Sequence, residues 1–229
     1  MLQNWFDTLY STFIEGARYM MIVEGLINTL IITVGALVIG VCIGSIVAIA
    51  KYFADDDPRL RVIKWICDIY TTVIRGVPIV VLLLIFYFLV FKAMDGVSVA
   101  IIAFGINSGA YVAEIVRSGI FAVDSGQMEA GRSLGMSKSM TMWRIVFPQA
   151  LKNILPAIGN EMIALLKETS VAGYVAVMDV TRAGNLIRNN TYDAFNPLML
   201  VALIYLTLVI GLTALLGRVE KRLRKSDKR

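Results

Sequence analysis

The chain has 229 residues, of which 58% are hydrophobic, and its 22 Lys and Arg outnumber its 17 Asp and Glu for a formal net charge of +5. An ordinary soluble domain is about 45–50% apolar, and the excess here lies in long uncharged runs, so composition indicates a membrane protein. The sequence has no histidine and only two cysteines. This argues against a Cys/His zinc site, a disulfide framework and a histidine-based hydrolytic centre.

Residues 1–21 precede the first long hydrophobic run and are predicted to form an extracytoplasmic interfacial segment. They lack a basic start and carry Asp7, Glu15 and Arg18, so we expect no cleavable signal peptide. Apolar residues recur at helical spacing over residues 5–13, which is typical of an amphipathic helix lying in the membrane interface. A frayed terminus is the equal alternative.

Five hydrophobic segments predict an all-α membrane protein with five transmembrane helices in a single domain of residues 22–217. Each segment, with its flanks, is long enough to cross about 30 Å of hydrocarbon at a rise of about 1.5 Å per residue. The second is expected to begin as a tilted segment before Pro78. The segments are residues 22–50, 61–92, 97–120, 150–174 and 195–217.

Small residues recur at the spacing that allows helices in a membrane to approach each other closely. Gly40 and Gly44 form one GxxxG pair, and Gly105 and Gly109 form another. These pairs predict a tightly packed helix bundle and carry no information about a substrate.

The distribution of Lys and Arg predicts the orientation of the chain. Residues 218–229 form a densely basic tail, and an odd number of spans places the two termini on opposite sides. With this tail in the cytoplasm, the basic stretches at 51–64 and 117–152 also lie inside, as the positive-inside rule requires. The N-terminus is therefore expected outside. Because this rule accounts for the net charge, no nucleic-acid partner is expected.

The polar loop of residues 122–148 between the third and fourth segments is predicted to contain two short helices. Asp124 or Ser125 suits the N-cap of the first helix, which then runs to about Leu134. Gly135 permits a turn with positive φ after it.

The second short helix of this loop is predicted to begin at a Ser137 cap and to run to about Ile145, with Pro148 ending the element before the fourth span. No GxxxxGK[ST] pattern occurs, so the loop is not expected to bind a nucleotide itself. Such a helix-turn-helix is suited to docking into a partner, whereas the alternative is an ordinary interfacial connector.

The residues of this loop resemble the EAA loop of the permease subunits of ABC importers. The family pattern is Glu-Ala-Ala, then Gly, then Ile-x-Leu-Pro at fixed spacing. Gly131 replaces the second Ala and Phe147 replaces the Leu. The matching residues are Glu129-Ala130-Gly131, Gly135 and Ile145-Val146-Phe147-Pro148.

Three further segments resemble the polar amino acid uptake subfamily, the histidine-, glutamine- and arginine-type permeases. Val77 replaces a Thr of that pattern. The segments are residues 71–78, 107–114 and 159–161, and the resemblance extends over roughly residues 20–222.

The resemblance implies a permease of a type I ABC importer in the bacterial cytoplasmic membrane, which is not an enzyme by itself. It implies alternating access driven by two ATPase subunits that hold ATP and Mg, so that no cofactor is expected in this chain. It also implies a second permease subunit, identical or related, and an extracytoplasmic substrate-binding protein. The residues expected to couple to the ATPase are Glu129, Ala130, Gly131, Leu134 and Gly135.

Three ionisable residues lie within predicted spans, where such residues are costly and usually functional. Arg75 suits the carboxylate of an amino acid, whereas Glu114 and Glu161 suit its ammonium group. The excess of carboxylates favours a cationic cargo, although a permanent Arg75–Glu114 pair that holds helices or closes a gate is the alternative. Neutral hydrogen-bonding residues of the expected pathway are Thr71, Asn107, Ser108, Tyr111 and Asn160.

Two other functions are also compatible with a helical membrane protein, namely an ion-coupled secondary transporter and a channel or sensor subunit. The first commonly shows repeated halves with interrupted helices, but five spans do not divide into two. Neither alternative explains the spacing between Glu129 and Pro148.

Overall fold

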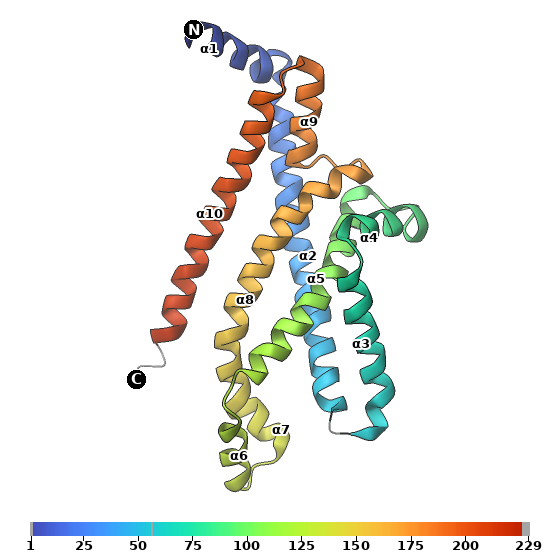
Figure 1. The fold of residues 1–229 in the computed structure, drawn as a ribbon, viewed down its shortest axis with the longest axis vertical. Coiled ribbons are helices and arrows are strands. Elements are labelled where there is room, and N and C mark those ends of the chain that lie inside the picture. The colour runs from blue at the N-terminus through green and yellow to red at the C-terminus, as the bar shows by residue number, and fades with distance from the viewer. Residues whose placement is uncertain (1, 56, 226–229) are drawn as a thin grey trace. The chain divides into compact units, whose positions relative to one another are not determined.

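The computed structural model describes residues 2–55 and 57–225, and this part of the chain contains helices and no β-strand (Figure 1). The prediction of an all-α protein is therefore confirmed. Met1 of the predicted N-terminal segment and residues 226–229 of the predicted basic tail lie outside the described residues.

The chain divides into two compact units. Unit 1 comprises Met1–Ala36, Pro78–Phe104 and Ile163–Leu212, and unit 2 comprises Leu37–Val77, Gly105–Met162 and Thr213–Arg229. The helices that contribute residues to both units are α2 (Tyr19–Ala54), α5 (Gly96–Phe121), α8 (Phe147–Glu168) and α10 (Phe195–Lys225).

Three helical segments of the described chain are long and apolar enough to cross a membrane, namely Tyr19–Ala54, Gly96–Phe121 and Phe195–Leu223. A fourth span results if the helical stretches Pro58–Gly76 and Ile79–Val90 form one broken span around Pro78. The multi-pass architecture is thus confirmed, whereas the fifth span stays a prediction. The predicted segment 150–174 falls mainly on α8, whose ionisable residues lower its mean hydropathy. These are Lys152, Glu161, Lys167 and Glu168.

The N-terminal segment of unit 1 is helical. Helix α1 (Leu2–Leu9) runs into a π-helical turn, Tyr10–Ile14. The side chains of Phe6 and Tyr10 are exposed, as an amphipathic interfacial helix requires, while that of Trp5 lies outside the described part. The Thr12 hydroxyl donates a hydrogen bond to Asp193 Oδ2 at 3.0 Å, which attaches the segment to the turn before α10.

The sequence analysis did not anticipate helix α9 (Val180–Thr191) of unit 1. Asp179 caps it by accepting hydrogen bonds from the backbone amides of Thr181 and Arg182, and burial nevertheless raises the pKa of the Asp179 carboxyl. A Cβ at Gly25 of α2 would lie 2.7 Å from the Asp179 carbonyl oxygen, so only glycine permits this approach. The Asn28 side chain completes the contact by donating to the Met178 carbonyl at 2.9 Å.

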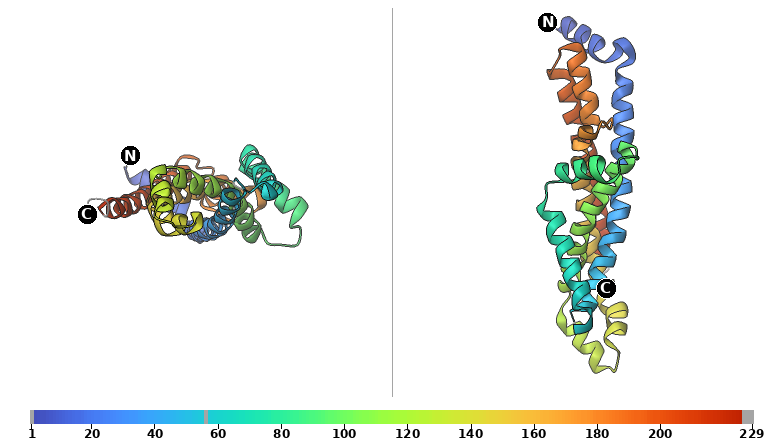
Figure 2. Two further views of the ribbon diagram at one scale, coloured as in Figure 1. Left: turned by 90° about the horizontal axis from the view of Figure 1, so that it is seen from below. Right: turned by 90° about the vertical axis from the view of Figure 1, so that its right-hand side faces the viewer.

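Unit 2 contains α3 (Arg61–Gly76) and the short helices α6 (Ser125–Ser133) and α7 (Lys138–Thr141), whereas α4 (Ile79–Ile85) belongs to unit 1. In Figures 1 and 2, α6 and α7 lie side by side as a helical hairpin. The core of this unit joins α2, α5 and α8. Its buried members are Ala48, Val112, Val116, Ala150 and Ile154.

The predicted glycine pairs mark close helix contacts in unit 2. A Cβ at Gly40 would lie 2.7 Å from Ser108 Oγ, and one at Gly44 would lie 2.6 Å from Val112 Cβ. Gly109 would meet the hydroxyl of Tyr70 at 2.7 Å. The expectation of close helix approach is therefore confirmed for these three positions.

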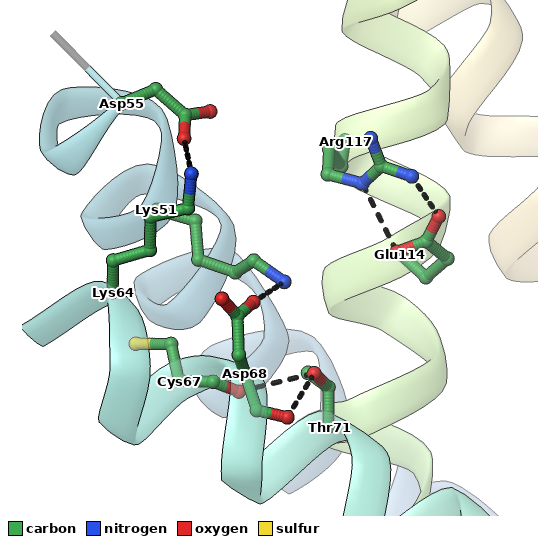
Figure 3. A network of polar contacts seen from close by, with 8 residues as sticks. All are labelled: Lys51, Asp55, Lys64, Cys67, Asp68, Thr71, Glu114 and Arg117. Atoms are coloured by element: carbon green, nitrogen blue, oxygen red, sulfur yellow. Dashed lines mark hydrogen bonds and ion pairs between the residues drawn. The ribbon is translucent and has the colours of Figure 1, made fainter.

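Two ion pairs tie α3 to the C-terminal end of α2. Lys51 Nζ lies 2.6 Å from Asp68 Oδ1, and Lys64 Nζ lies 2.5 Å from Asp55 Oδ1 (Figure 3). In the first pair the amine belongs to α2 and the carboxylate to α3, whereas in the second the amine belongs to α3 and the carboxylate directly follows α2. Both pairs therefore hold α3 against the same end of α2.

Candidate functional site

Three elements of unit 2 surround a hollow of about 400 Å³ that is lined by charged, polar and apolar side chains. The end of α3 provides Arg75, α5 provides Tyr111 and Glu114, and α8 provides Asn153 and Glu161. The three predicted intramembrane charges thus line one hollow. A neighbouring hollow of about 380 Å³ shares Arg75 and Tyr111 and is otherwise lined by Thr71, Thr72 and Gly76.

Arg75 does not pair with Glu114. Its guanidinium carbon lies 5.2 Å from the centroid of the Tyr111 ring, a cation–π contact that leaves the guanidinium hydrogen-bond donors available. Glu114 instead accepts two hydrogen bonds from Arg117 one turn later in α5, from Nε at 3.1 Å and from Nη2 (Figure 3). The structure therefore contains no Arg75–Glu114 ion pair, and a role of these two residues in holding helices or closing a gate stays a prediction.

Glu161, like Arg75, has no ionic partner among the described residues. Its Oε1 accepts a hydrogen bond of 2.8 Å from the hydroxyl of Ser108, which is fully buried in α5. A carboxylate can accept several hydrogen bonds, and this one uses a single position. Glu161 can therefore receive a further donor from a ligand.

The other predicted pathway residues are placed differently. Thr71 donates to the carbonyls of Cys67 and Asp68 in its own helix, at 3.1 and 3.2 Å, so its hydroxyl hydrogen is already shared. Asn107 is buried, Asn160 is exposed, and neither belongs to the residues that line the two hollows.

Three polar or charged residues of this site, Arg117, Ser118 and Asn153, were not predicted from the sequence. Arg117 neutralises Glu114, and its i,i+3 spacing from Glu114 was a signal that could have found it. Asn153 lines the hollow from α8, and no local pattern marked it.

The loop after α5 forms the predicted helix-turn-helix. The Asp124 side chain accepts from Gly126 N at 2.7 Å and caps α6. At the other end Gly135 has φ +81°, and Met136 N donates to the Gly131 carbonyl while Gly135 N donates to the Arg132 carbonyl. These two bonds define a Schellman motif, the helix ending that favours glycine.

The residues of the expected coupling surface do not all face outward. Glu129, Ala130, Leu134 and Gly135 are exposed, with Leu134 at 80% of its full area. Gly131 is buried, and a Cβ there would lie 2.4 Å from Thr141 Cγ2 of α7. The glycine thus accommodates Thr141, which explains why this chain differs from the Ala of the resembling pattern.

The prediction that Pro148 ends the second helix is wrong. Helix α7 continues through a π-helical turn, Met142–Val146, directly into α8, with Pro148 in its first turn. Proline has no amide hydrogen to donate there, and the wider π turn accommodates it in a continuous helix. The Gln149 side chain donates to the Ile145 carbonyl at 2.9 Å and to Gln127 Oε1 of α6 at 3.2 Å.

Residues 40–225 match the family described as binding-protein-dependent transport system inner membrane component. The chain belongs to this family. It is 40% identical over 210 residues to the arginine transport system permease protein ArtQ of Bacillus subtilis, which covers 90% of this chain and 94% of that protein. The protein is therefore a permease subunit of an importer that works with ATPases and substrate-binding proteins, in the cytoplasmic membrane.

Two solved structures share the fold of the permease. A chain from the crystal structure of an amino acid ABC transporter with histidines has a TM-score of 0.84 and 40% identity, covering 92% of this chain and 98% of that chain. A chain of the MetNI methionine ABC transporter in inward-facing conformations has a TM-score of 0.77 at 20% identity, covering 90% and 97%, and shows the fold alone.

Proposed function

We propose that this permease passes a polar amino acid through the hollow between Arg75 and Glu161. The observation that carries this proposal is that a single hollow of unit 2 has one positive and one negative side chain, neither of which has an ionic partner within residues 2–55 and 57–225. A zwitterionic amino acid offers a carboxylate to the first and an ammonium group to the second. The relatives named for arginine and crystallised with histidines support this substrate class.

The charges of the hollow change the expectation about the cargo. The excess of carboxylates that favoured a cationic amino acid disappears, because Arg117 neutralises Glu114. One net positive and one net negative group remain for the backbone charges of any amino acid. Selection among side chains is then assigned to the substrate-binding protein and to the neutral wall of the hollow, which includes Ser118 and Asn153.

We infer that the exposed end of α6 docks into the ATPase subunit. Glu129, Ala130, Leu134 and Gly135 form its exposed surface, which lies on a cytoplasmic loop in the orientation that the basic residues favour. Because α7 continues without interruption into α8, a displacement of the loop reaches the helix that carries Glu161. This supports an alternating-access cycle in which ATP and Mg are held by the ATPase and a second permease completes the pathway.

The experiment is uptake by the complete transporter, reconstituted with its ATPase and substrate-binding protein and supplied with radiolabelled arginine, histidine, glutamine or leucine. We expect ATP-dependent uptake of at least one polar amino acid and a strong loss in Arg75→Met and Glu161→Gln. Asn160→Ala is the matched control, since Asn160 is exposed next to Glu161 and does not line the hollow. Uptake by Arg75→Met and Glu161→Gln equal to that of the control would refute the proposed pathway.

A further inference from the structure

An apolar cavity of about 220 Å³ lies in unit 2. Unlike the hollow that contains Arg75 and Glu161, it is lined by no charged residue. Its wall is formed by α2, by Val116 and Ile120 of α5, by the π-helical turn that joins α7 to α8, and by α8 itself. Only Ser45 and Tyr52 contribute hydroxyl groups to a wall that is otherwise aliphatic, aromatic or thioether. Such a lining cannot satisfy the charges of an amino acid. A ligand of this cavity would therefore be apolar.

One cationic side chain contacts a lining residue of this cavity, and a second belongs to the chain neighbour of another lining residue. Lys138 Nζ of α7 lies 5.2 Å from the centroid of the Tyr52 ring, and Tyr52 lines the cavity. Arg144 is exposed and follows Trp143, another lining residue, in the π-helical turn. The ligand that fits both features has a hydrocarbon chain and an anionic head.

We propose that this cavity holds an acyl chain of an anionic phospholipid, with Lys138 and Arg144 contacting the headgroup phosphate. Residues 41–53 of α2 line it, and they form the last turns of a candidate membrane span that also carries Lys51. A segment of a membrane span is surrounded by lipid, and basic residues near the membrane surface attract anionic headgroups. Charge complementarity therefore selects an anionic phospholipid over a zwitterionic one.

The bound acyl chain would contact the segment that connects α7 to α8. Met142, Trp143 and Phe147 line the cavity and belong to the π-helical turn and the first residue of α8. An acyl chain there fills space beside the helix that connects the helix-turn-helix to Glu161. The lipid site itself does not depend on the amino acid that is transported.

The test uses the fluorescence of Trp143 in the complete transporter, placed in lipid nanodiscs. Lipids with brominated acyl chains quench nearby tryptophans, and the signal of Trp143 is the difference between the native complex and a Trp143→Phe complex. Brominated phosphatidylglycerol and brominated phosphatidylcholine are compared at equal mole fraction. We expect phosphatidylglycerol to quench Trp143 at least about twofold more strongly, which corresponds to about 0.4 kcal/mol in preference.

Three variants decide the outcome. Lys138→Gln with Arg144→Gln should abolish the preference, and Ser45→Phe should lower quenching by both lipids because it fills the cavity. Arg61→Gln, an exposed basic residue of α3 outside the cavity lining, should retain the preference. Equal quenching by the two lipids, or an equal loss of preference in Arg61→Gln, would overturn the proposal. Protection of Trp143 from both lipids would show that a protein partner covers the cavity, and would also overturn it.

Discussion

Unit 2 contains both the helix-turn-helix of α6 and α7 and the hollow between α3, α5 and α8, but these two regions are stabilised by different kinds of contact. The helix-turn-helix depends on contacts between residues a few positions apart, such as the Asp124 cap and the Schellman bonds at Gly135. The hollow depends on side chains as distant as Ser108 and Glu161, 53 positions apart. Local chemistry shapes the proposed docking surface, while tertiary packing shapes the proposed path of the amino acid.

The largest effect is expected at the exposed surface of the helix-turn-helix. Glu129→Lys reverses a charge on α6, and placing like charges across an interface costs several kcal/mol. We expect uptake to fall to background while the loop keeps its fold, because Glu129 is exposed and makes no hydrogen bond or ion pair in the described structure. ATP hydrolysis and uptake are measured on the same assembled complex. Full uptake by an intact Glu129→Lys complex would show that this surface does not dock.

A smaller but still large effect is expected in the hollow. Glu161→Gln keeps the shape and the hydrogen bond from Ser108 but removes the charge. Hydrogen bonds to charged groups contribute about 1.5–3 kcal/mol, so the KM of uptake should rise by about tenfold to a hundredfold. The basal ATP hydrolysis of the complex should change little. A KM equal to that of Asn160→Ala would separate Glu161 from the cargo.

These two regions also differ in how far the sequence predicted them. The cap at Asp124, the positive φ at Gly135 and the cap at Ser137 were predicted correctly, because each follows from one residue type at one position. The partner of Glu114 was not, because several cations were within reach in sequence and only the folded structure places Arg75 over Tyr111 and Arg117 beside Glu114. Helix α9 was missed because its polar sequence resembles a loop, and contacts with Gly25 and Asn28 stabilise it.

An intermediate effect is expected where α6 packs on α7. Gly131→Ala places a Cβ within 2.4 Å of Thr141 Cγ2, and overpacking of this kind costs about 1–3 kcal/mol. Thermal unfolding of the assembled complex should therefore occur at a lower temperature. Gly131→Ala combined with Thr141→Ser, which removes the obstructing methyl group, should recover most of the loss. No recovery in the double variant would show that the two helices are not held by this contact.

The smallest effect is expected at Glu114. Its partner Arg117 is one turn away on the same helix and both side chains are partly exposed, and such pairs contribute only about 0.3–0.5 kcal/mol. Glu114→Gln should leave the unfolding temperature nearly unchanged and alter the KM of uptake much less than Glu161→Gln. A loss equal to that of Glu161→Gln would restore Glu114 to the proposed pathway.

The most direct test of the central claim, that the hollow is the path of the amino acid, is the accessibility of single cysteines. Asn153→Cys and Asn160→Cys are compared in a complex whose Cys42 and Cys67 are replaced by serine, since both Asn residues are exposed on α8 but only Asn153 lines the hollow. The transported amino acid, with its binding protein and ATP, should slow thiol labelling at position 153 and leave position 160 unchanged. Equal labelling rates at position 153 with and without the amino acid would contradict the account.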